Sequence, residues 1–188
     1  MIIGVLGRKG SGKDTISDYI VNHYEYEKMQ FAEPLKNACK ILFNFSDEQL
    51  HGNLKETIDP QWGVTPRHVL QYVGTDMFRN HINGLIPGTD NNFWVNLLKV
   101  KFHKKLEENK YSQVIVSDVR FQNEIDVIHE LGGKVIKLIR PSLSNTDAHE
   151  SEKNIDLLKG DITIVNDGTL EELYSKIKKC YIEQIFNN

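Results

Sequence analysis

The chain is poor in the residues that mark several classes of protein. Its 188 residues include only two cysteines, Cys39 and Cys180, and neither has the spacing of a metal site. We therefore expect reduced thiols in a cytoplasmic protein rather than a disulfide framework. The apolar residues 1–7 are too few to span a membrane, and they lack the basic start and the cleavage site of a secretory signal.

Excess charge of one sign is also absent. The formal net charge is −3 and no long basic run occurs, so the composition argues against a surface for duplex nucleic acid. We expect neither nucleic acid nor a membrane as a partner. Hydrophobic residues make up 39% and charged residues 26%, which is ordinary for a globular protein with one well-buried core. Basic side chains are therefore expected to serve specific anions.

Apolar runs with the character of strands alternate with segments of helical periodicity. The expected buried strands are 2–6, 28–31, 114–117, 135–139 and 162–165. The expected helices are 15–23, 34–42, 66–82, 93–108, 123–131 and 170–186. Residues 44–66 are polar and turn-rich and predict a loop or a small insertion. This alternation indicates an α/β fold with a parallel sheet covered by helices on both faces, which binds ligands beyond the carboxyl ends of its strands.

The first of these strand ends has the sequence of a phosphate-binding loop. Residues 7–13, GRKGSGK, match the pattern Gly-x-x-x-x-Gly-Lys and lie between an expected strand and an expected helix. Such glycines let backbone N–H groups turn onto phosphate oxygens, the helix N-terminus favours negative charge, and Lys13 is placed to reach the outer phosphates. The structural alternative is a glycine-rich turn followed by a surface lysine.

The residue after this lysine departs from the strict pattern. Asp14 stands where a serine or threonine hydroxyl usually ligates Mg²⁺, and Thr15 supplies a hydroxyl one position later. A carboxylate beside a triphosphate is repelled unless a cation lies between them. Asp14 could therefore hold Mg²⁺, directly or through water, while Thr15 donates to a phosphate. Alternatively, Asp14 only favours the first turn of its helix.

A second polar group follows the expected strand 114–117. A carboxylate in the position of Asp118 can order Mg²⁺ or its water, and Arg120 can clamp a phosphate with its fork of donors. A structural ion pair is the alternative. Glu124, one turn into the next helix, could orient Arg120 or a sugar hydroxyl, or it could be a solvated residue.

Two helices carry further candidate ligands for a nucleotide. Lys36 opens the helix after the second expected strand and is a candidate phosphate contact. Arg67 and Gln71 are four residues apart and share a helix face, so that one could hold a monophosphate while the other reads a base. A solvated polar face is the alternative for this pair.

The last two strand ends are polar as well. Arg140 borders a polar stretch, and it could complete charge neutralisation if a lid over about residues 141–160 closes. Asn166 and Asp167 follow the final strand, where the backbone and the amide could read an adenine amino group. An ordinary turn explains these two residues equally well.

Taken together, these motifs resemble phage-type deoxynucleoside monophosphate kinases. The segments that carry the resemblance are GRKGSGKDT, WGVTPRHVLQYVGTD, SDVRFQNE, IRP and NDGTLEEL, and they run from residue 1 to about 180. The resemblance implies a single P-loop kinase domain, 1–188, with five parallel strands, a substrate-binding insertion over about 44–92 and a lid over about 141–160. It also implies a homodimer and phosphoryl transfer from ATP, with Mg²⁺, to a deoxynucleoside monophosphate.

The resemblance, together with the motifs described above, assigns roles to residues. Those expected to bind ATP are Lys9, Gly10, Ser11, Gly12, Lys13, Asp14 and Thr15, with Asn166 and Asp167 at the base. Those expected at the acceptor are Leu35, Lys36, Arg67, Gln71, Gly74, Thr75, Trp94, Asp118, Arg120 and Glu124, with Lys55 in place of a family arginine. The insertion is shorter here than in the family, so the choice among dTMP, dGMP and modified dCMP stays open.

Catalysis is expected to rest on positioning and charge neutralisation by Lys13, Asp118, Arg120 and Arg140. An acceptor phosphate oxygen is already anionic near neutral pH, so no general base is needed. Two alternatives remain: a small-molecule kinase resembling phosphomevalonate kinase, and a regulator that binds ATP without transferring phosphate. Gln71 and Trp94 favour an acceptor that carries a base.

Overall fold

The structure is a computed structural model that describes residues 1–143 and 154–186. The chain divides into two compact units, one formed by Met1–Gln30 and Lys99–Asn188 and the other by Phe31–Leu98, here called unit 1 and unit 2. Among the described residues, no helix combines the length and the apolar character needed to cross a membrane.

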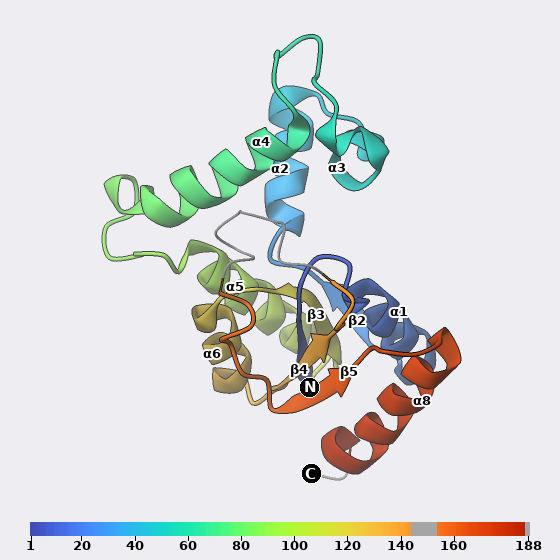
Figure 1. Ribbon diagram of the computed structural model, residues 1–188. Helices are drawn as coiled ribbons and strands as arrows, with labels where there is room; N and C mark the ends of the chain where they lie inside the picture. The colour runs from blue at the N-terminus through green and yellow to red at the C-terminus, as the bar shows by residue number, and fades with distance from the viewer. Residues whose placement is uncertain (144–153, 187–188) are drawn as a thin grey trace. The chain divides into compact units, whose positions relative to one another are not determined.

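Unit 1 contains a five-stranded parallel sheet, as the sequence predicts (Figure 1). Its strands are β1 Ile2–Leu6, β2 Glu27–Met29, β3 Val114–Val119, β4 Lys134–Ile139 and β5 Ile162–Val165, in the spatial order β2-β3-β1-β4-β5. The central strand β1 is buried along its whole length, which explains its continuous apolar sequence. Strands β2 and β3 lie on one side of β1, and β4 and β5 lie on the other, and open α/β sheets bind ligands at such a switch point.

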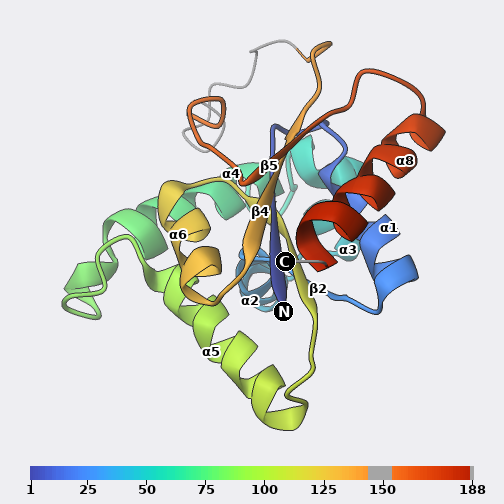
Figure 2. The same ribbon diagram turned by 90° about the horizontal axis from the view of Figure 1, so that it is seen from below.

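Helices cover both faces of this sheet (Figure 2). One face packs against α1 Lys13–Tyr24 and α8 Leu170–Cys180, which continues as the π-helix η4 Tyr181–Phe186. The other face carries α6 Gln122–Glu130, and a side chain added at Gly4 of β1 would collide with Ile128 of this helix. The predicted three-layer α/β sandwich is therefore confirmed. The expected lid, about 141–160, includes residues 144–153, which lie outside the described part of the chain.

All the regular elements of unit 2 are helices. These are α2 Glu33–Phe43, α3 Asp47–His51, η1 Asn53–Glu56, α4 Pro66–Gln71, η2 Tyr72–Asn80, η3 Ile82–Gly84 and the start of α5 Phe93–Glu108. Of the two alternatives for 44–66, a loop or a small insertion, the loop is wrong at α3. Ser46 and Gln49 form a capping box there, in which the serine hydroxyl accepts the Gln49 N–H at 3.2 Å and the glutamine carbonyl accepts the Ser46 N–H at 2.9 Å.

The helix predicted over 66–82 has the expected position but changes type along its length. It is α-helical through Gln71 and then continues as the π-helix η2. The buried indole N–H of Trp94 donates to the Gly74 carbonyl at 2.9 Å. A Cβ at Gly74 would lie 2.7 Å from a methyl carbon of Leu35, so the absence of a side chain permits this close approach. The π-helix is therefore held by contacts with Leu35 and Trp94. The spacing of apolar residues along the sequence does not reveal these contacts.

Candidate active site

The loop between β1 and α1 requires glycine for its path. Gly10 has φ +79° and Gly12 has φ +103°, a region that L-residues with side chains rarely adopt. A Cβ on Gly12 would also lie 2.9 Å from the side-chain nitrogen of Asn166. The sequence pattern therefore forms a turn that only glycine adopts without strain, at the switch point of the sheet, which is the backbone of a phosphate-binding loop.

The loop is closed on itself through one carbonyl group. The Arg8 carbonyl accepts the Ser11 N–H at 3.1 Å and the Lys13 ammonium at 2.7 Å. The hydroxyl oxygen of Ser11 is buried and makes no hydrogen bond within the described residues. Lys13 thus rests on the loop itself, and its ammonium has three N–H donors, of which this contact uses one.

Side chains from two other strand ends support the loop. Asn166, after β5, donates to the Ser11 carbonyl at 2.9 Å, and Arg140, after β4, donates to the Gly10 carbonyl at 3.3 Å. Loop carbonyls held by protein donors suit a loop that offers its N–H groups to an anion. Asp167 instead pairs with Lys176 of α8 at 2.6 Å. The structure thus brings Asn166 and Arg140 to the loop, while Asp167 faces α8.

Lys13 lies at the centre of a charged group. Its side chain is buried, and burial together with the Arg120 guanidinium lowers the pKa of the Lys13 ammonium to about 8, against the opposing effect of Asp14 and Asp118. Unit 1 therefore brings together four of the residues singled out from the sequence. Two cations held near each other favour an anion between them, because its charge relieves their repulsion.

Glu124 is buried and holds the turn that carries Arg120. One of its carboxylate oxygens accepts the backbone N–H of Arg120 at 2.7 Å and that of Phe121 at 3.2 Å. Of the alternatives for Glu124, this geometry favours orientation of Arg120 and does not favour a solvated surface residue.

Asp14 is exposed, and it lies 3.2 Å from the ammonium of Lys28, which also pairs with Asp18 at 2.9 Å. Thr15 follows it and is half-buried. Residues 1–143 and 154–186 contain no cluster of three or more His, Cys, Asp or Glu side chains arranged for a metal ion. Mg²⁺ in kinase sites takes most of its ligands from phosphates and water and only one or two from carboxylates, so the expected roles of Asp14 and Thr15 do not require such a cluster.

Unit 2 contains a basic cluster of its own. The Lys36 ammonium lies 3.3 Å from the ring nitrogen Nδ1 of His51, and burial together with Lys36 and Lys55 lowers the pKa of this histidine. Two predicted acceptor residues are thus close to one another. His51 was missed, because a histidine in the last turn of a short, unpredicted helix carries no signal of its own.

The other predicted acceptor residues of unit 2 fall into two groups. Arg67 forms an ion pair with Glu56, and Gln71 is half-buried one turn further along α4. The remaining predicted residues lie along η2 or pack against it, and they are Leu35, Gly74, Thr75 and Trp94.

The sheet order and the glycine loop define this chain as a P-loop kinase in fold. It is similar to the solved structure of dephospho-CoA kinase from Campylobacter jejuni, with a TM-score of 0.52 and 16% sequence identity, covering 97% of this chain and 96% of that one. At this identity the likeness supports the fold alone.

Sequence comparison gives the family. The model of the deoxynucleotide monophosphate kinase family matches residues 1–59 and 46–177. A protein of Acanthamoeba polyphaga mimivirus, described provisionally as a deoxynucleotide monophosphate kinase, is 44% identical over 184 residues, covering 96% of this chain and 95% of the relative. The deoxynucleotide monophosphate kinase of Enterobacteria phage T4 is 27% identical, covering 94% of this chain and 97% of the relative. The chain belongs to the deoxynucleotide monophosphate kinase family and is a kinase.

Proposed function

We propose that the protein transfers the terminal phosphoryl group of ATP to the phosphate of a deoxynucleoside 5′-monophosphate, with Mg²⁺ as the cofactor. The observation that carries this proposal is that Lys13 and Arg120 follow two strands that pair in parallel, with Leu6 of β1 opposite Val119 of β3, and the nearby guanidinium lowers the pKa of the ammonium. One cation follows β1 and the other follows β3, so a donor and an acceptor phosphate could meet between them.

The residues present fit a nucleotide polyphosphate. The glycines at 10 and 12 keep the loop free of side chains, and Asn166 and Arg140 hold its carbonyls. Lys9, Ser11 and Thr15 complete the proposed donor site. Mg²⁺ would be held by Asp14 and Thr15 together with phosphate oxygens and water, and it would neutralise charge on the transferred group.

The chemistry asks little of the protein beyond positioning. The acceptor oxygen is already anionic near neutral pH, so no side chain has to remove a proton from it. Lys13 would donate to a phosphate oxygen, and Arg120 would face the acceptor phosphate with its orientation fixed by Glu124. Arg140 would add positive charge from the β4 side. Asp118 lies near this group and would order the metal's water.

We propose that unit 2 recognises the acceptor. Its cluster of Lys36, His51 and Lys55 suits an anionic group, while Arg67 and Gln71 offer a fork of donors and an amide on one helix. Trp94 and Leu35 would shape the wall behind them. The chemistry fits a nucleoside monophosphate, and dTMP, dGMP and modified dCMP are the acceptors to test first.

A panel of acceptors tests this proposal. The purified protein is incubated with ATP and Mg²⁺ and with each deoxynucleoside monophosphate in turn, and ADP release is measured together with the identity of the nucleotide product. Ribonucleoside monophosphates and a phosphorylated small alcohol serve as controls. We expect ADP and a deoxynucleoside diphosphate in equal amounts for at least one base. Bound ATP without transfer to any acceptor would contradict the proposal.

A further inference from the structure

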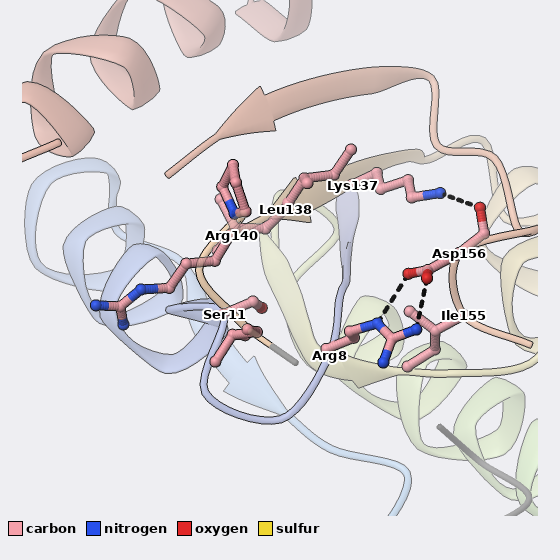
Figure 3. A pocket seen from close by; sticks show the side chains of 10 residues that line it. Arg8, Ser11, Lys137, Leu138, Arg140, Ile155 and Asp156 are labelled. Atoms are coloured by element: carbon pink, nitrogen blue, oxygen red, sulfur yellow. Dashed lines mark hydrogen bonds and ion pairs between the residues drawn. The ribbon is translucent and has the colours of Figure 1, made fainter. Parts of the chain in front are cut away.

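Arg8, the first variable residue of the phosphate loop, is already engaged by a distant carboxylate. Its Nε donates to Oδ1 of Asp156 at 2.9 Å and its Nη2 donates to Oδ2 at 2.5 Å, in the two-pronged geometry that arginine forms best with carboxylates (Figure 3). The side chain of Arg8 is 17% exposed and that of Asp156 is 59% exposed. The pair joins residues that are 148 positions apart in the chain.

The segment that carries Asp156 is itself attached to β4. The Lys137 ammonium donates to the carbonyls of Asp156 and Leu158, at 2.8 and 2.6 Å. Ile155 is 1% exposed, so this segment is packed as well as hydrogen-bonded. Asp156 is therefore a fixed anchor, and Figure 3 shows Lys137 and Arg8 reaching it from two sides.

The backbone carbonyl of Arg8 takes part in the hydrogen bonds of the loop. It accepts both the Ser11 N–H and the Lys13 ammonium. A pocket of about 320 Å³ is lined by residues of the loop and of the end of β4, among them Ser11 and Leu138, and by Leu143. Gly7 packs closely on the Leu138 carbonyl, and Asn166 and Arg140 hold two loop carbonyls, but the side chain of Arg8 lines this pocket. The fork to Asp156 joins Arg8 to another residue of the same lining.

We propose that Arg8 and Asp156 are positioning residues that hold the phosphate loop in the form that binds the donor's phosphates. The contact acts through the Arg8 carbonyl, which sets the turn to Ser11 and the resting place of Lys13. The inference rests on the proposed function, because it takes ATP as the ligand of the loop. In this proposal Arg8 does not contact the phosphates, whereas Lys13 does.

A double-mutant cycle on ATP binding tests the inference. The variants are Arg8→Met, Asp156→Ala and the double variant, and the dissociation constant for ATP is measured by calorimetry in the full-length protein. The matched control is the pair Lys99→Met and Glu130→Ala, because Lys99 and Glu130 form an ion pair of similar exposure in unit 1, with 29% and 62% of the side chains exposed. Steady-state kinetics with ATP and the best acceptor are measured in parallel.

We expect each single variant to weaken ATP binding about fivefold, the effect of an ion pair at the upper end of the usual range. The double variant should be no weaker than the singles, because both remove the same contact. The KM for ATP should rise while kcat at saturating ATP stays within about twofold, as expected when ground-state and transition-state binding are lost equally. The control pair should leave ATP binding unchanged.

Three outcomes would overturn the inference. If Asp156→Ala tightens ATP binding while Arg8→Met weakens it, Arg8 is a phosphate ligand that Asp156 restrains. If the two single effects add in the double variant, the residues act separately. If neither variant changes ATP binding although the wild-type protein binds ATP, the contact is structural only. A wild-type protein that fails to bind ATP would refute the proposed function itself.

Discussion

The phosphate loop and the helices of unit 2 present their polar groups in different ways. In the loop, positive φ angles at Gly10 and Gly12 fix the backbone, and Asn166 and Arg140 hold its carbonyls. In unit 2 the candidate ligands are side chains that already contact other side chains, as Arg67 contacts Glu56 and Lys36 contacts His51.

The difference has a consequence for binding. The backbone of the loop needs little rearrangement to bind phosphates. Changes in the loop should therefore weaken ATP binding strongly, whichever acceptor is supplied. Side chains in exposed ion pairs can change partners at small cost. Changes in unit 2 should therefore alter the acceptor's KM and the choice among acceptors, with little effect on ATP.

The largest effect is expected from Lys13→Ala. This change removes the cation that would contact the transferred phosphate, and loss of one such electrostatic donor typically lowers kcat by about 10²–10³. Because Lys13 is buried and its pKa is lowered, its removal should not lower the melting temperature. Steady-state kinetics and a thermal melt check both points. Turnover within about tenfold of wild type would contradict the assigned role.

A comparison of two glycines tests the backbone part of the account. Gly12→Ala places a Cβ 2.9 Å from the Asn166 nitrogen at φ +103°, whereas Gly10→Ala at φ +79° places it 3.6 Å from Leu143. We expect Gly12→Ala to lower the free energy of unfolding by about 2 kcal/mol and to weaken ATP binding, and Gly10→Ala to cost about 1 kcal/mol.

Denaturant unfolding and ATP titration of these two variants measure the difference. Equal effects would show that the contact with Asn166 does not constrain the loop. A larger loss of stability and of ATP affinity in Gly12→Ala than in Gly10→Ala is the informative result, because both changes introduce the same methyl group.

The acceptor side is tested by Arg67→Met. Loss of a charge-assisted contact to the acceptor phosphate should raise the KM for the deoxynucleoside monophosphate about tenfold, while the KM for ATP stays the same. Glu56→Gln is the matched control, because it removes the present partner of Arg67 and leaves the guanidinium in place. Its acceptor KM should stay equal or fall. A rise of the same size in both variants would mean that the ion pair is structural.

The smallest effect concerns pH. The pKa of Lys13 in the free protein is about 8, and a bound phosphate should raise it, because negative charge stabilises the ammonium. ATP binding should therefore take up a proton as the pH passes through this value, about half a proton at the midpoint, and the affinity should fall at higher pH. Calorimetry in buffers of different ionisation enthalpy measures this uptake. Lys13→Arg should abolish it, since arginine stays protonated.

Much of unit 1 could be predicted from the sequence. The continuous apolar runs predicted β1, β3, β4 and β5 within one or two residues of their observed bounds. For β1 and β3 the physical reason is burial on both faces of the sheet, which requires an unbroken apolar run. The loop at 7–13 was equally clear, since its glycines are needed locally. The order of the strands was not predictable from periodicity, because it depends on how the crossovers pack.

The missed features depend on contacts distant in sequence or on short elements. The five-residue helix α3 carries a capping signal at Ser46 and Gln49, but it is too short to show periodicity. The change to a π-helix in η2 coincides with the packing of Trp94 on Gly74. No local pattern could pair Arg8 with Asp156. The sequence thus indicates candidate residues, but few of the contacts that hold them.

The most direct test follows the phosphorus atom itself. ATP labelled with ³²P in its terminal phosphate is mixed with Mg²⁺, the preferred deoxynucleoside monophosphate and either the wild-type protein or Lys13→Ala, and the products are separated. The account predicts label in the deoxynucleoside diphosphate, matched by ADP, with wild-type protein and almost none with the variant. Label that stays in ATP or appears only as inorganic phosphate, whichever acceptor is supplied, would contradict it.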